Sequence, residues 1–155
     1  FSELEIMNDV EVKARYEIQM EDYAKEIQIE GRTLGDIARN HVIPTALEYQ
    51  NKIIKNVEGM KSIFEEEYRE MAKEQISIIK DISNHVSEIN KNVHEMIDAR
   101  KKANKIEDAT DRAYAYCNEV KPYFDTIRYH CDKLELVVDD ELWPLTKYRE
   151  MVFTK

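Results

Sequence analysis

Four histidines are the first residues to examine for chemistry, because an imidazole is both a common metal ligand and a proton carrier. They are His41, His85, His94 and His130. A di-iron site in a helical bundle requires a glutamate three residues before a histidine on two helices, and a zinc protease requires His-Glu-x-x-His. The sequence contains neither pattern. We therefore expect structural histidines and no metal site.

The two cysteines, Cys117 and Cys131, are separated by 14 positions. On one helix they would lie about 21 Å apart, at about 1.5 Å of rise per residue, which is too far for a disulfide. Neither belongs to a Cys-x-x-Cys pair of the kind that binds zinc or performs redox chemistry. We expect two free thiols that pack as small hydrophobic groups in a helical seam, in a reducing cytoplasm.

Charged side chains cluster in three places. The acidic run 65–67 is typical of the first turn of a helix, and the basic residues Arg100–Lys102 with Lys105 are typical of a last turn. The acidic run 139–141 falls at an expected helix end, where the helix dipole disfavours it, so it serves a site or a contact, or the helix continues. With no phosphate-binding loop or nucleophile motif in the sequence, we expect no catalytic or cofactor-binding residue here.

Composition points to helices rather than sheets. The 155 residues include only three glycines and three prolines, whereas sheets need turns rich in both. The 32 acidic and 23 basic side chains give a net charge of −9, which disfavours binding to nucleic acid or to an anionic membrane surface. The longest uncharged run, Asn40–Leu47, is far shorter than the roughly 20 apolar residues that span a bilayer.

Apolar spacing predicts the architecture. Steps of three and four residues, typical of coiled-coil seams, connect two sets of side chains: Ile79, Ile82, Val86, Ile89, Val93 and Met96, and then Ala113, Cys117, Val120, Phe124, Ile127, Cys131, Leu134 and Val138. A less regular stripe comprises Tyr16, Met20, Tyr23, Ile27, Leu34, Ile37 and His41, with Glu30 in the missing step. We predict an all-α fold, an elongated antiparallel bundle of about four long helices with coiled-coil-like packing.

The expected helices lie near 3–43, 45–60, 64–103 and 109–140, in a single domain over 1–155. The stripe loses its phase at Pro44, which predicts a break or a kink there. The next turn falls within 59–67. At Pro122 the seam keeps its phase, so the helix either continues with a kink or restarts there. Capping patterns mark helix starts at Ser2, Thr45 and Ser62, and a weaker one begins at Asp108.

The C-terminal tail contains six large apolar groups in a short segment that also holds Pro144. Left in water they would form a patch of the kind that marks an interface. These groups pack either on the side of the bundle, which we favour and which would bury most of the Trp143 ring, or on a surface outside this chain. The candidate interface residues are Leu142, Trp143, Leu145, Tyr148, Met151 and Phe153.

Three stretches carry a family resemblance. They are RYEIQMEDYAKEIQIEGRTLGDIARNHVIPTALEYQ (15–50), DARKKANKIED (98–108) and AYCNEVKPYFDTIRYHCDKLELVVDDELWPLTKYREMVF (115–153). These stretches resemble the C-terminal region of type III glutamine synthetases, the large bacterial form of that enzyme. The resemblance extends over nearly the whole chain, and Phe1 in place of an initiator methionine agrees with a piece of a longer protein.

The resemblance implies that the parent enzyme makes glutamine from glutamate, ammonia and ATP, with Mg or Mn as the metal. The family's catalytic and metal-binding residues lie in an upstream region, so none is carried onto this chain. The resemblance also implies that the partners are that upstream catalytic region and neighbouring subunits of a ring-shaped homo-oligomer. We expect a non-catalytic structural or oligomer-contact domain, and the alternative is an independent helical protein-interaction module.

Overall fold

The computed structural model describes residues 8–147, and within that range the chain forms helices and no strand. The all-α prediction is therefore confirmed. In chain order the helices are α1 (Asp9–Ile37), the π-helical turn η2 (Ala38–Val42), α2 (Ile43–Phe64), α3 (Tyr68–Met71), α4 (Lys73–Ala103), α5 (Ala109–Ala115), the π-helical turn η3 (Tyr116–Val120) and α6 (Pro122–Val137).

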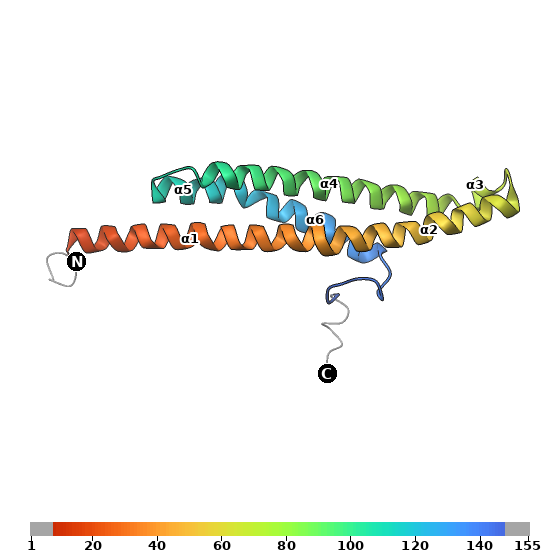
Figure 1. Ribbon diagram of the computed structural model, residues 1–155, viewed down its shortest axis with the longest axis horizontal. Helices are drawn as coiled ribbons and strands as arrows, with labels where there is room; N and C mark the ends of the chain where they lie inside the picture. The colour runs from red at the N-terminus through yellow and green to blue at the C-terminus, as the bar shows by residue number, and fades with distance from the viewer. Residues whose placement is uncertain (1–7, 148–155) are drawn as a thin grey trace, which may run out of the picture.

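The helices form an elongated antiparallel bundle (Figure 1). α1 and α2 lie end to end, α4 returns alongside them, and α5 and α6 run back again against α1 and α4. The register is fixed by contacts far apart in sequence: the Gln50 side-chain amide donates to the Ile79 carbonyl at 2.8 Å and to the Ser83 hydroxyl at 2.7 Å. The predicted bundle of about four long helices corresponds to α1, α2, α4 and α6.

Neither Pro44 nor Pro122 ends a helix. The residue before each proline donates its N–H to the carbonyl five residues back, from Ile43 to Ala38 and from Lys121 to Tyr116. A proline ring in an α-helix clashes with the carbonyl four residues back, and the wider π turn removes that clash. The expected separation of 3–43 from 45–60 is thus wrong, because η2 absorbs the phase shift within one continuous helix.

The turn predicted within 59–67 lies in the last part of that range. α2 continues through Gly59 to Phe64, and Glu65 then adopts a positive φ of 47°. The predicted cap at Ser62 is wrong, because its hydroxyl donates back to the Glu58 carbonyl at 3.0 Å inside the helix. Thr45 is likewise inside a helix and bonds the His41 carbonyl.

The caps of α5 and α1 are side-chain acceptors. The predicted cap at Asp108 is confirmed, since its carboxylate accepts the Asp111 N–H at 2.9 Å. The start of α1 was missed in the sequence: Asn8 and Glu11 form a reciprocal capping box there. Ser2 lies outside the described residues.

The core follows the two predicted seams of α4 and of α5–η3–α6, whose members are buried or half-buried. The predicted face of α1 is only partly right, since Glu30 and His41 are exposed. The buried face is built largely from small residues: Ala24, Ile27, Gly31, Gly35, Ala38 and Val42. Small residues let the α1 backbone approach α4 and α6 closely, and the stripe of large apolar residues did not reveal them.

Candidate functional site

The four histidines are placed at three separate positions. His41 is exposed, with its Nε2 4.0 Å from the Asp36 carboxylate. The Nδ1 of His94 accepts from the Arg39 guanidinium at 3.3 Å. His85 and His130 lie together, as described next. Among residues 8–147 no three His, Cys, Asp or Glu side chains form a group that could hold a metal ion.

His85 of α4 and His130 of α6 form a pair that sequence spacing did not reveal. Their Nδ1 atoms are 2.9 Å apart and their ring centroids 5.2 Å apart. This hydrogen bond requires one ring to donate and the other to accept, so the pair cannot be doubly protonated without losing it. Burial lowers the pKa of His85, and the neighbouring His130 lowers it further. The hydrogen bond therefore joins α4 to α6 and requires at least one of the two rings to be neutral.

The two cysteines are free and half-buried. Cys131 packs against the core cluster, and burial raises the pKa of its thiol to about 12. Cys117 lines a shallow apolar groove with Tyr16, Met20 and Tyr23 of α1. The raised pKa of Cys131 is the opposite of what a nucleophilic thiol needs.

The acidic run 139–141 forms hydrogen bonds with neighbouring residues of the tail. It follows the end of α6, and the Asp139 carboxylate accepts the Glu141 N–H at 2.9 Å. The Lys147 ammonium donates to Asp140 at 2.5 Å and to the Val138 carbonyl at 2.9 Å. These bonds fold the tail back over the end of α6.

The tail docks on the bundle through Trp143. This side chain is 8% exposed and belongs to the core cluster, which confirms the docking predicted for it. Leu142 is half-buried against the same cluster, and Leu145 is exposed. The Lys147 ammonium lies 5.9 Å from the centre of the Trp143 ring. Tyr148, Met151 and Phe153 lie outside the described residues, and an interface role for the six tail residues stays a prediction.

Other apolar side chains are exposed along the rod, Leu136 most of all, and several of them lie at its two ends. The first part of α1 extends beyond the other helices (Figure 1). Its exposed apolar residues are Val10, Val12, Tyr16 and Ile18, and Ile29 is exposed further along the helix. At the opposite end Ile63, Phe64 and Met71 are exposed beside the α2–α3 turn. We call the segment Asp9–Gln19 the α1 arm.

Comparison with known proteins places the chain in a family. The model of the glutamine synthetase C-terminal domain matches residues 1–61. A glutamine synthetase of Bacteroides fragilis (strain YCH46) is 48% identical over 97% of this chain. A type-3 glutamine synthetase of Dictyostelium discoideum is 28% identical over 100% of it. The chain corresponds to the C-terminal region of a glutamine synthetase.

The chain covers only part of each of these relatives. It spans 21% of the length of each of these glutamine synthetases. The matched residues 1–61 include α1, η2 and most of α2, so the α1 arm belongs to the part that the domain model recognises. None of the helices within 8–147 is long and apolar enough to span a membrane.

Proposed function

We propose that this C-terminal region is a non-catalytic structural domain that contacts neighbouring subunits, or the upstream catalytic region, of a cytoplasmic glutamine synthetase. In this proposal the enzyme makes glutamine from glutamate, ammonia and ATP. ATP and Mg or Mn bind outside this chain. The domain's own contribution is a rigid helical rod with apolar surfaces at its ends.

The observation that carries the proposal is the exposed apolar surface of the α1 arm. Val10 is 76% and Ile18 55% exposed, although both stand on a regular helix with a capping box at its start. Positions eight residues apart lie about 80° apart around a helix and so share one side of it, and an exposed apolar side of this kind is a candidate for a surface that another protein covers. In an enzyme built of several copies, a helix that projects past its own bundle can supply such a contact.

The proposal is tested in the full-length enzyme with Val10→Glu and Ile18→Glu, measuring the mass of the assembly by light scattering. Gln19→Glu is the matched control, because it adds one negative charge at an exposed position of the same arm and removes no apolar surface. We expect both apolar variants to shift the assembly to smaller species and the control to leave it unchanged. Full assembly in both apolar variants would contradict the proposal.

A second measurement separates contact from folding. In the isolated 155-residue chain the same substitutions should leave the melting temperature nearly unchanged, because both residues are mostly exposed and neither belongs to the core of residues 8–147. Exposed positions of this kind usually change the free energy of unfolding by less than about 0.5 kcal/mol.

A further inference from the structure

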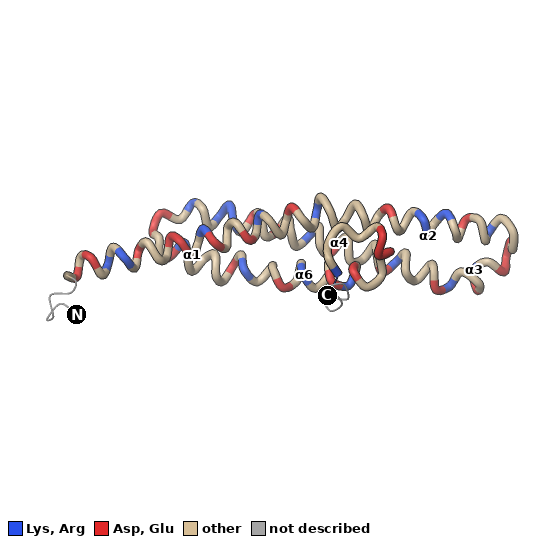
Figure 2. Tube along the Cα trace, turned by 90° about the horizontal axis from the view of Figure 1, so that it is seen from below, with Lys and Arg blue, Asp and Glu red and all other residues tan. Residues whose placement is uncertain are grey.

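A groove between α1 and α4 gathers three arginines in a chain whose net charge is −9. Acidic and basic residues otherwise alternate along much of the rod (Figure 2), apart from the basic run that continues from Arg100 through Lys102. The groove has a volume of about 370 Å³ and is lined by Arg32, Arg39 and Arg100 together with Asp36, Asn40 and the apolar residues Val93 and Ile97. This volume lies within the range of small-ligand sites.

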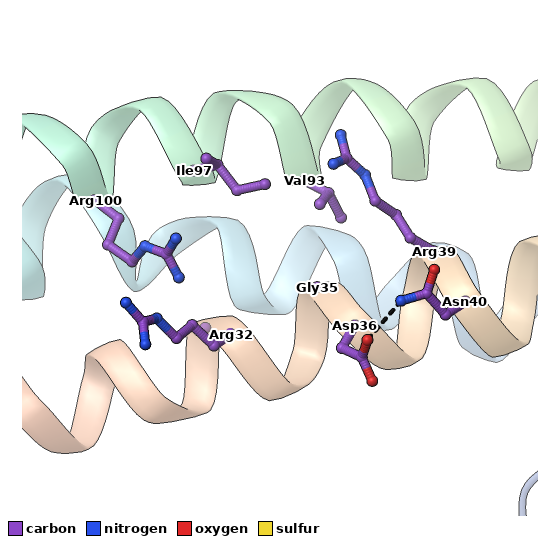
Figure 3. Close-up of a pocket in the computed structure, with 9 residues that line it drawn as sticks. Arg32, Gly35, Asp36, Arg39, Asn40, Val93, Ile97 and Arg100 are labelled. Carbon is purple, nitrogen blue, oxygen red and sulfur yellow. Dashed lines mark hydrogen bonds between the residues drawn. The ribbon is translucent and has the colours of Figure 1, made fainter.

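Two of the arginines oppose each other across the groove. Arg32 comes from α1 and Arg100 from α4, and their guanidinium groups point toward one another (Figure 3). The same two side chains lie near the buried Tyr116, where burial raises the pKa of the phenol and their positive charges act in the opposite direction. Two like charges that face each other repel, so a nearby negative charge would stabilise this arrangement.

The acidic side chains of residues 8–147 do not supply this charge by direct contact. No ion pair joins Arg32, Arg39 or Arg100 to an acidic side chain of that range. The one acidic side chain in the lining, Asp36, accepts instead from the Asn40 amide at 2.5 Å and points away from the two facing guanidinium groups (Figure 3).

Two guanidinium donors in the groove are also left without a partner. The Nε atoms of Arg39 and Arg100 are buried and make no hydrogen bond. Buried donors in native proteins are almost always satisfied, and an unsatisfied one points to a group that completes the site. By contrast, the nearby Arg112 donates to the carbonyls of Ile106 and Glu107.

We propose that this groove binds a small, multiply charged oxyanion of the phosphate class, gripped between Arg32 and Arg100. A phosphate has tetrahedral oxygens that can accept the forked donors of two guanidinium groups from opposite sides. A single planar carboxylate offers two oxygens in one plane and matches one fork only. The ligand would neutralise the facing charges and join α1 to α4 in the middle of the rod. This inference goes beyond the proposed subunit contact and does not depend on it.

The test is the melting temperature of the 155-residue chain in inorganic phosphate, compared with sodium chloride and with succinate at equal ionic strength. A ligand that binds only the folded state raises the melting temperature, and the increase grows with the logarithm of the ligand concentration once that exceeds the Kd. We expect phosphate to raise it above both comparison salts. The increase should disappear in Arg32→Gln and in Arg100→Gln, and it should persist in Arg15→Gln, an exposed arginine of α1 outside the groove.

Arg100→Lys sharpens the test, because lysine keeps the charge but lacks the fork, so the phosphate effect should decrease rather than vanish. Arg32 is exposed, so its replacement by Gln leaves the core intact and tests the proposal even where an Arg100 variant unfolds. Equal stabilisation by phosphate and chloride, by phosphate and succinate, or in Arg32→Gln and Arg15→Gln would each overturn the assignment.

Discussion

The three glycines occupy very different surroundings. A β-carbon at Gly31 would lie 3.3 Å from the Phe124 ring, while one at Gly59 would meet nothing within 4 Å. Both residues are inside long helices, where glycine costs about 1 kcal/mol relative to alanine. The stability effect of adding a methyl group is therefore set by the neighbour at each position.

We predict that Gly59→Ala raises the free energy of unfolding by about 0.5–1 kcal/mol, because helix propensity improves and nothing has to move. Gly31→Ala should gain little, because the buried Phe124 ring must shift, and Gly31→Leu should destabilise by about 1–3 kcal/mol through overpacking. Urea unfolding of the three variants measures the order. An equal gain from alanine at Gly31 and Gly59 would show that α1 does not pack closely against α6.

The two thiols should differ in reactivity. The pKa of Cys131 is about 12 against an ordinary 9.0, so its thiolate is about a thousandfold scarcer at pH 8 than in the unfolded chain. Cys117 lines a surface groove and should react much faster. Alkylation followed by mass spectrometry of each site measures both rates, and denaturant should make them similar. Rapid labelling of Cys131 in the folded chain would contradict its placement against the core.

At the scale of elements, the His85–His130 pair makes the α4–α6 contact sensitive to pH. Burial and the neighbouring His130 lower the pKa of His85, Lys133 lowers it as well, and Asp81 partly opposes them. Tyr129 packs edge-on against His130. Because the folded state holds His85 at a pKa below 6.5, the unfolded chain binds more protons in acid. Stability should be complete above about pH 6.5 and should decrease as the pH falls through the lowered pKa.

Melting temperatures measured from neutral to mildly acidic pH test this dependence. His85→Asn should flatten the decrease, since the group that resists protonation is gone. His41→Asn is the control, because His41 is exposed and belongs to no such pair. An unchanged pH dependence in His85→Asn would assign the acid sensitivity to other groups.

The π turn before Pro44 predicts how the chain responds to the deletion of one residue. A π turn inserts extra backbone that relieves the clash of the proline ring. Deleting Asn40 alone should therefore destabilise by about 3 kcal/mol, and adding Pro44→Ala should restore most of that loss, because the segment can then become an ordinary α-helix. The control is deletion of Glu26 from α1, which rotates one part of the helix by about 100° relative to the core. Pro44→Ala should not restore the stability lost in that chain. Urea unfolding measures all four chains.

At the scale of the whole molecule, the bundle could be predicted from the sequence because the spacing of apolar residues within one helix defines that helix's buried face. The spacing of Ile82, Ile89 and Val93, or of Phe124, Ile127 and Leu134, is enough to define a buried face. The buried face of α1 could not be predicted in this way, because Gly31 and Gly35 become core positions only through the side chains that pack against them. The same holds for the histidine pair and the arginine groove. Each joins residues more than 40 positions apart, and a stripe on one helix contains no information about its neighbour.

The tail packs on the bundle through Trp143, and Lys147, at the end of the described chain, bonds back to the end of α6. This ammonium is buried, donates to the Val138 carbonyl and Asp140, and lies near the Trp143 ring. Lys147→Met removes those bonds and leaves the carbonyl of the buried Val138 without this donor, a loss of about 1–3 kcal/mol. Because that loss falls on a short segment after α6, we expect the tail to detach while the helices remain.

Fluorescence of Trp143, the single tryptophan, reports on this directly. In the unmodified chain its emission should be blue-shifted and resistant to acrylamide, because the ring is 8% exposed. In Lys147→Met the emission should shift to longer wavelength and become quenchable, with the far-ultraviolet circular dichroism unchanged. Lys52→Met, at an exposed position of α2, should leave both signals as they are. Red-shifted, freely quenched emission from the unmodified chain would mean that Trp143 does not pack on the bundle and is exposed for contact with a partner.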